Sequence, residues 1–269
     1  MLKYLIYLFG VFIIQSGFTP AHKEGESLDS VILKMMEETQ NISKLAFQIK
    51  NCERIGSEMK CGKQQVSLLT KPFKCHINML HPDKGNQIIY NEEVSKKATY
   101  MPKGFPYINV ELSPLGSQMR KNNHHSIYEL GFGFFTQLIN HYYLKHESSF
   151  TFRKTITEKK TEYHISSTLK GFKYVKHIVL KGETVRTIAK KKFVSEHLIL
   201  EKNKELSPYQ VGDTILIPNQ YYQKLNVVVE GENYTPKFIE VFDDKGLLEK
   251  YEFSELNINP VFTEQTFKE

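Results

Sequence analysis

YVKHIVLKGETVRTIAKKKFVSEHLILEKNKELSPYQVGDTILIPNQY, residues 174–221, contains a complete strand–helix–helix–strand pattern in one short stretch. From Val175 to Leu180 successive side chains are expected to alternate between two faces, which is typical of a strand. Thr214–Pro218 is expected to form the second strand. Two helices lie between them, and their apolar positions are Val185, Ile188, Ala189, Leu198, Ile199 and Leu200. The turns and caps that divide these elements are Gly182, Glu183-Thr184, Ser195, Asn203 and Gly212-Asp213. Asn203 is expected to close the second helix in the left-handed conformation.

The same stretch resembles a LysM domain, the cell-wall module that binds N-acetylglucosamine chains. The matching residues, in order and spacing, are Gly182-Glu183-Thr184, Ile188-Ala189, Val194-Ser195, Asn203, Val211-Gly212-Asp213 and Ile217-Pro218. Glu183 stands where Asp is usual, and Phe193 stands where Gly commonly precedes the Val-Ser step. The resemblance implies peptidoglycan as a partner, with sugar contacts from Gly182, Glu183, Thr184, Val185, Asn203, Leu206, Ser207 and Pro208. The alternative is that these residues serve only as turns and caps, and that the module is structural.

The composition is that of a folded protein with a mixed-charge surface. The 269 residues are 40% apolar, which is enough for a packed core and one small extra module. The formal net charge is +6, but lysines are interspersed with glutamates, which is typical of a solvated surface. The run Lys190-Lys191-Lys192 is expected on an exposed helix face, where it could also favour an anionic wall or lipid surface.

The N-terminus has the three parts of a secretory signal peptide, which we place at residues 1–21. Lys3 gives a basic start, Tyr4–Ile14 is apolar, and Thr19-Pro20-Ala21 offers a small-residue exit. The apolar run is shorter than the about 20 residues of a spanning helix. We therefore expect export to the periplasm, with an uncleaved N-terminal anchor as the alternative. Export also argues against nucleic acid as a partner.

Three cysteines fit an exported protein with at most one disulfide. Gly56-Ser57 suits a tight hairpin turn, and counting outward from it places Cys52 opposite Cys61. At a non-hydrogen-bonded pair the Cα atoms approach to about 4.5 Å, which is within disulfide range. The same register places Phe47 opposite Val66 on the other face. We predict a Cys52–Cys61 disulfide, and Cys75 as a buried, inert thiol.

The remaining chain alternates between helices and many short strands. An amphipathic helix is expected from Ser27 to Gln40, and Ser113-Pro114 has the pattern of a helix start. The apolar segment Ser126–Leu144 should pack against the sheet, with Gly131 and Gly133 allowing close approach. The expected strands are Lys44–Cys52, Met59–Thr70, Phe73–Leu80, Gln87–Tyr90, Val94–Met101, Tyr107–Leu112, Phe150–Ile156, Tyr163–Leu169, Leu225–Val229, Lys237–Asp243 and Leu248–Leu256.

The last three strands are too few to form a core alone, so we expect them to complete the sheet that begins at Lys44. The chain therefore divides into residues 27–173, an insertion at 174–221, and closing strands at 222–269. This arrangement resembles an uncharacterised bacterial periplasmic family with a fold similar to LolA, the lipoprotein carrier. The segments that carry this resemblance are the first helix, Lys71-Pro72-Phe73, Gly85–Tyr90, Ile239–Asp243 and Gly246–Tyr251.

The LolA resemblance implies an α+β fold, in which helices cover the concave face of a curved antiparallel half-barrel. It also implies a hollow that holds an acyl chain of a lipid or lipoprotein. The candidate lining residues are Phe47, Phe73, Ile77, Phe134, Phe135, Leu138, Phe238 and Tyr251. The same residues would equally describe a filled core, because both need apolar inward faces.

The sequence displays no recognised catalytic or metal-binding motif. There is no HExxH run and no Gly-x-Ser-x-Gly elbow. His124-His125, His141 and His146 lack an established ligand spacing and are expected to be exposed or helix-flanking. His197 and Glu201 are expected to be surface neighbours. We therefore expect a non-catalytic binding protein without cofactor or metal; the alternatives are a cell-wall hydrolase and a structural scaffold. The sequence leaves the oligomeric state open.

Overall fold

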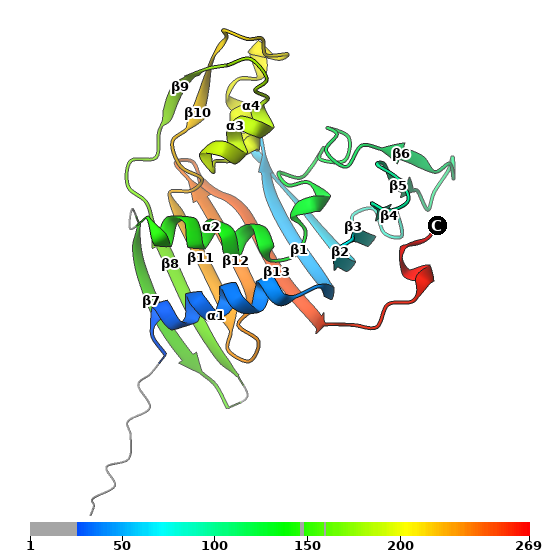
Figure 1. Ribbon diagram of the computed structural model, residues 1–269, viewed down its shortest axis with the longest axis horizontal. Helices are drawn as coiled ribbons and strands as arrows, with labels where there is room; N and C mark the ends of the chain where they lie inside the picture. The colour runs from blue at the N-terminus through cyan, green and yellow to red at the C-terminus, as the bar shows by residue number, and fades with distance from the viewer. Residues whose placement is uncertain (1–25, 146–147, 159) are drawn as a thin grey trace, which may run out of the picture.

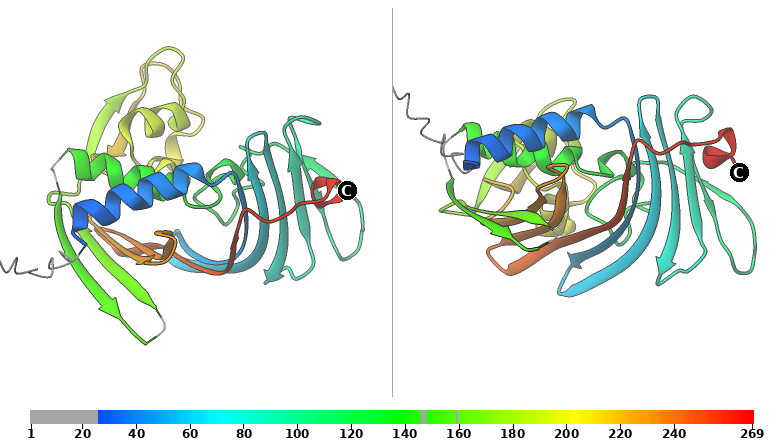
Figure 2. Two further views of the ribbon diagram at one scale, coloured as in Figure 1. Left: turned by 60° about the horizontal axis from the view of Figure 1, so that its bottom comes forward. Right: turned by 90° about the horizontal axis from the view of Figure 1, so that it is seen from below.

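The computed structural model describes residues 26–145, 148–158 and 160–269. It shows an α+β fold built on an eleven-stranded antiparallel sheet in the order β6-β5-β4-β3-β2-β1-β13-β12-β11-β8-β7. The sheet is strongly curved, and helices α1 and α2 lie across its concave side (Figures 1 and 2). The predicted signal peptide lies outside the described residues. Within them, no helix is both long and apolar enough to cross a membrane.

The expected strands are present with small shifts at their ends, except that Val94–Met101 and Tyr107–Leu112 form strands only in their second halves. Those of the large sheet are β1 (Lys44–Ile55), β2 (Glu58–Thr70), β3 (Phe73–His81), β4 (Gln87–Asn91), β5 (Ala98–Met101), β6 (Val110–Leu112), β7 (Ser149–Ile156), β8 (Thr161–Thr168), β11 (Lys224–Glu230), β12 (Pro236–Asp243) and β13 (Gly246–Ile258). Inward-facing side chains alternate along β1, where Leu45, Phe47 and Ile49 are buried. They form one core with the buried faces of α1 and α2.

Helix α1 (Leu28–Asn41) follows the amphipathic pattern closely. Ser27 caps it by accepting a hydrogen bond from the Ser30 backbone N–H at 3.2 Å. Val31, Ile32 and Met35 form its buried face, as the spacing predicts.

The next apolar segment packs against the sheet, as expected, in two pieces. Residues 126–144 form a short 3-10 turn η1 (Ile127–Glu129) and then α2 (Gly133–Leu144), separated at Gly131. Gly131 has a φ of 81°, and an added Cβ would lie 3.2 Å from the Leu68 side chain, so close approach to the sheet explains the break. The helix start predicted at Ser113-Pro114 is wrong, because the chain forms turns there.

The hairpin of β1 and β2 has the predicted register. Cys52 pairs with Cys61 and Phe47 with Val66. The Cys52–Cys61 disulfide is present, with the Cα atoms 4.0 Å apart. Such a disulfide indicates an oxidising, extracytoplasmic compartment. Cys75 is fully buried, and burial raises the pKa of its thiol to about 12.

The chain closes the sheet at two places that are distant in sequence. β13 pairs with β1, so the last strand lies beside the first. β8 and β11 are also antiparallel neighbours, although residues 174–221 separate them. This segment, here called the insertion, stands where a hairpin turn would otherwise join the two strands (Figure 1).

The insertion has the expected strand–helix–helix–strand order and a small core of its own. It consists of β9 (Tyr174–Ile178), α3 (Val185–Lys192), α4 (Glu196–Lys202), the 3-10 turn η2 (Lys204–Leu206) and β10 (Thr214–Pro218). β9 and β10 pair with each other and not with the large sheet. Its core consists of Val179, Val185, Ile188, Ala189, Val194, Ile199, Ile215 and Ile217.

Two cap conformations in the insertion differ from expectation. Asn203 is not left-handed: its φ is −117°, and its side chain instead bonds the backbone of Ile199 and Leu216. The left-handed residue is Phe193, with φ 56°, which closes α3. Asn203 therefore serves to tie α4 to β10, and the conformation that favours Gly falls where Phe replaces the usual Gly.

Candidate functional site

A pocket of about 520 Å³ lies between the concave face of the sheet and the insertion. We call it the main pocket. Strands β1 to β3 and the end of α1 form one side, and the start of α2 lies beside them. Helices α3 and α4 of the insertion form the opposite side, so the large domain and the insertion share the cavity.

The main pocket has both apolar and polar walls, and the apolar part is somewhat larger. Leu45, Leu68 and Phe73 come from the sheet. Phe134 comes from α2, and Phe193 comes from the insertion. Contributions from three separate parts of the fold therefore form the apolar part of one cavity.

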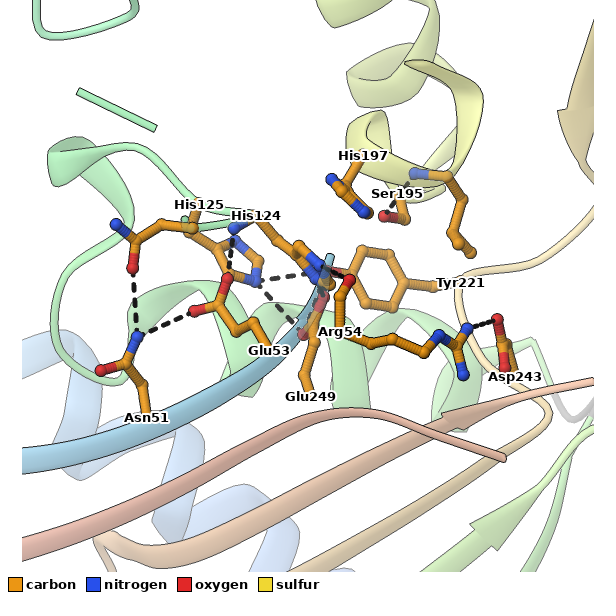
Figure 3. Close-up of polar contacts among 12 residues, drawn as sticks. Asn51, Glu53, Arg54, His124, His125, Ser195, His197, Tyr221, Asp243 and Glu249 are labelled. Atoms are coloured by element: carbon orange, nitrogen blue, oxygen red, sulfur yellow. Dashed lines mark hydrogen bonds and ion pairs between the residues drawn. The ribbon is translucent and has the colours of Figure 1, made fainter. Parts of the chain in front are cut away.

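A buried polar cluster lies at the inner side of this pocket, around the fully buried Glu249 of β13 (Figure 3). The Glu249 carboxylate is 2.8 Å from His124 Nδ1 and 3.3 Å from His125 Nε2, and the Tyr221 hydroxyl donates to it at 3.1 Å. Burial raises the pKa of Glu249, but the two histidines outweigh it and hold this pKa far below its usual value. Glu249 is therefore a buried anion that joins three side chains.

His124 is held in its protonated form. Its Nδ1 faces the Glu249 carboxylate and its Nε2 faces the Arg54 carbonyl oxygen, also at 2.8 Å. Both partners are acceptors, so both ring nitrogens must donate, which requires the imidazolium cation. Burial lowers the pKa of His124, yet these bonds and the nearby carboxylates raise it overall.

His125 lies between two carboxylates. Besides Glu249, Glu129 Oε2 is 3.7 Å from its Nδ1, and these charges raise the pKa of His125 well above its usual value despite burial. Burial raises the pKa of Glu129, but His125, the Ser126 backbone and the Arg186 charge together outweigh burial and lower this pKa to about 2. His125 is therefore a cation at the wall of the pocket.

Ion pairs connect this cluster to the insertion. Arg186 of α3 is 3.1 Å from Glu196 of α4 and 3.7 Å from Glu129 of the large domain. Arg120, from the turns before η1, is 3.0 Å from the other oxygen of Glu196. Residues from both sides of the main pocket are thus held in one network.

A stacked histidine pair forms a second connection. His197 of α4 lies on His124 with ring centroids 3.8 Å apart and planes 18° apart (Figure 3). Burial and the His124 charge lower the pKa of His197 to about 3, so this ring is neutral. The pair is one cation and one neutral ring across the boundary between domain and insertion.

Seven of the eight predicted acyl-chain residues lie inside the structure, in three different places. Phe73 and Phe134 line the main pocket. Ile77, Phe135 and Tyr251 line a smaller pocket of about 110 Å³ on the other side of the 125–131 loop. Phe47 and Leu138 are fully buried in the core.

Phe238 does not belong to the interior. Its neighbours Ile239 and Val241 are buried in the core, whereas Phe238 lies on the outer face of β12 beneath the Lys250 ammonium. Its placement in the hollow was wrong, because strand alternation puts it on the opposite face from Ile239.

The predicted sugar-contact residues lie mainly in the segments before α3 and after α4, and none of them lines the main pocket. Five of them are exposed: Gly182, Thr184, Leu206, Ser207 and Pro208. Val185 is in the small core, and Asn203 is buried with its side chain bonded to backbone. Glu183 bonds His177 at 2.8 Å and the Leu180 N–H at 3.1 Å, which is a structural role.

The expectation that the His124-His125 pair is exposed or merely flanks a helix was wrong for His124, which is only 5% exposed. His197 is likewise enclosed rather than a surface neighbour of Glu201. Their partners Glu53, Glu249 and Arg54 are distant in sequence, so no local spacing signals the cluster. Among the described residues, which exclude His146, no three metal-ligating side chains gather as a metal site.

Comparisons with known proteins place the chain among remote structural relatives. No curated protein matches it. Similar solved structures include a LolA superfamily protein from Nitrosomonas europaea, with 10% identity over 91% of this chain and 98% of that chain and a TM-score of 0.36. The Mycobacterium tuberculosis lipoprotein LppX has 10% identity over 88% of this chain and 99% of that chain, with a TM-score of 0.42. Likenesses this remote carry no argument about ligand or partner.

A family model matches residues 42–269, which include the insertion and both of its flanks, and this match gives no support for a LysM domain. By this match the chain belongs to the family described as "Protein of unknown function (DUF1571)".

Proposed function

We propose that this protein is an exported, non-catalytic binding protein of the periplasm that holds the acyl chain of a lipid or lipoprotein in the main pocket. The observation that carries the proposal is the pocket itself, about 520 Å³, in which apolar side chains from the sheet, α2 and the insertion line one part and polar side chains line the other. Binding sites for small molecules measure about 300–1,000 Å³ and combine apolar walls with a few polar groups. The disulfide supports an oxidising compartment such as the periplasm.

The acidic residues beside the pocket argue against a hydrolase at this site. Sugar hydrolysis by a carboxyl pair needs one acid whose pKa is raised, so that it can protonate the leaving group. Glu129 and Glu249 both have a lowered pKa, because they serve as partners of histidine cations. The cluster thus has the properties of a structural ion network, which supports binding over catalysis.

Acyl-chain binding is tested by measuring the affinity of purified protein for saturated fatty acids of increasing length. Each buried methylene contributes about 0.8 kcal/mol, or roughly a fourfold increase in affinity, until the pocket is filled. We expect this rise with chain length, followed by a plateau. Affinity that is absent or independent of chain length would refute the proposal.

Two variants show where the chain binds. Phe134→Ala removes a ring from the pocket wall and should weaken binding by roughly fivefold, or about 1 kcal/mol. Phe238→Ala is the matched control, because this ring lies on the outer face and lines no part of the main pocket. Equal losses in the two variants would mean that the ligand does not occupy the main pocket. Thermal melts check that both variants remain folded.

Peptidoglycan binding by the insertion is a second candidate. It is favoured by the exposure of Gly182, Thr184, Leu206, Ser207 and Pro208 in the insertion. Co-sedimentation of the full protein with purified peptidoglycan at low salt tests this activity. If the folded protein stays in the supernatant, the insertion does not bind the cell wall and its role is confined to the main pocket.

A further inference from the structure

Helix α3 presents two different faces to its surroundings. Val185 and Ile188 face the small core of the insertion. Arg186, Lys190 and Phe193 recur at intervals of four and three residues, so they form a second stripe, and all three line the main pocket. The insertion is therefore a wall of the pocket, and it contributes the cations Arg186 and Lys190 to that wall.

The buried and half-buried charges around this wall pair with one another. The cations are Arg54, Arg120, His124, His125 and Arg186, and the anions are Glu53, Glu129, Glu196, Asp243 and Glu249. Two histidine cations are included because hydrogen-bond acceptors surround them, as described above. The cluster is balanced, so it offers no net charge to a ligand.

Lys190 is left outside this balance. It is exposed, it lines the main pocket, and among the described residues it has no ion-pair partner. Gln137 of α2, which also lines the pocket, is exposed as well. The exposed part of the pocket lining thus includes one uncompensated positive charge and one neutral amide that can donate hydrogen bonds.

We propose that the insertion selects the head group of the pocket's ligand, and that this ligand is an amphiphile whose head is anionic, a carboxylate or a phosphate. The inference rests on the acyl-chain function proposed above and names the ligand class of the same site. The chain lies against Leu45, Leu68 and Phe73, and the head stays at the exposed edge, where Lys190 meets it. Water can still solvate the head at this edge, so the anion need not be buried.

The expected effect is moderate and depends on salt. Ion pairs between exposed groups have measured strengths that correspond to about a two- to fivefold change in affinity. Screening over about 10 Å at 0.1 M salt weakens them further. The preference for an anionic head should therefore be largest at low ionic strength.

The test compares dodecanoate, dodecyl phosphate and methyl dodecanoate, which share a chain length and differ in the head group. Full-length protein should bind the two anions two- to fivefold more tightly than the ester at low salt. Lys190→Gln should abolish this preference while leaving the affinity for the ester unchanged, and Lys190→Glu should reverse it. Lys192→Gln is the matched control, because Lys192 is an exposed lysine of the same helix that does not line the pocket.

The outcomes separate this inference from the function on which it rests. Equal affinity of the wild type for the ester and the anions, or equal effects of Lys190→Gln and Lys192→Gln, would overturn head-group selection while acyl binding stands. If none of the three compounds binds, the acyl-chain function itself fails, and the inference fails with it. A preference for dodecyl phosphate over dodecanoate, or the reverse, identifies which anion the site takes.

Discussion

Replacing Glu249 by Gln removes the negative charge that holds the polar cluster together. Glu249 is fully buried and bonds His124, His125 and Tyr221, so the variant leaves two buried imidazolium cations without this counter-ion. Breaking a buried ion pair from one side costs about 3–5 kcal/mol. For a chain of this size, that corresponds to a fall in Tm of roughly 10 °C.

The pH dependence of this loss follows from the shifted pKa values. Glu249 has a pKa far below its ordinary value of 4.5, so its contribution to stability is present above pH 4.5 and is lost as the pH falls below it. His124 and His125 have pKa values raised above 6.5, so their contribution is present below pH 6.5 and is lost as the pH rises through the folded values. The three groups therefore stabilise the fold together between about pH 4.5 and 6.5.

Urea denaturation of wild type and Glu249→Gln across pH 4 to 9 measures this difference. The gap between the two proteins should be largest between pH 4.5 and 6.5 and should narrow above it. Glu252→Gln is the matched control on the same strand, since Glu252 lies on the outer face and, within the described part of the chain, its ion pairs are with lysines that are at least partly exposed. It should change the free energy of unfolding by less than about 1 kcal/mol. A Glu249→Gln loss no larger than that of Glu252→Gln, or a gap that widens steadily to pH 9, would refute the buried ion network.

Two further predictions concern the disulfide and the histidine stack. The double variant Cys52→Ser/Cys61→Ser opens a short loop and should lose about 2–3 kcal/mol of unfolding free energy, measured by urea denaturation; equal stability with and without reductant in the wild type would contradict this. His197 has a pKa lowered to about 3, so its own contribution to the stability of the wild type should be lost as the pH falls from 6.5 towards 3, by at most about 1.4 kcal/mol per pH unit. His197→Phe keeps a ring on His124 but cannot titrate, so its stability should fall less over this range, and an unchanged pH profile would show that His197 is not the titrating group.

The hairpin of β1 and β2 shows what sequence can predict. Its register follows from one turn at Gly56-Ser57 and from strict alternation, so the pairing of Cys52 with Cys61 needs no knowledge of distant residues. The pairing of β13 with β1 could be predicted for a different reason, because three strands without a helix cannot bury their own apolar face. Both are consequences of local pattern and of the need to cover a hydrophobic surface.

The polar cluster around Glu249 could not be predicted from local sequence patterns. His124, His197 and Glu249 lie on three elements that are far apart in the chain, and each has an unremarkable neighbourhood in sequence. Only the folded chain brings them together, because β13 returns beside β1 and the insertion folds back over the loop before η1. A single sequence shows which residues can ionise, but their pKa values depend on neighbours that the fold supplies.

Phe193 belongs to the insertion but makes contact with the large domain. The sequence shows that Phe193 replaces the Gly usual in LysM domains. The structure shows that its side chain makes contacts outside the insertion. It adopts the left-handed conformation at a cost that Gly would avoid, and its ring stacks on His141 of α2 at 4.3 Å while lining the main pocket. Gly at this position would relieve the backbone but remove both contacts. Phe193 thus packs the insertion against the large domain. Because this contact lies at the main pocket, we expect the insertion to act there as well as through its outer loops.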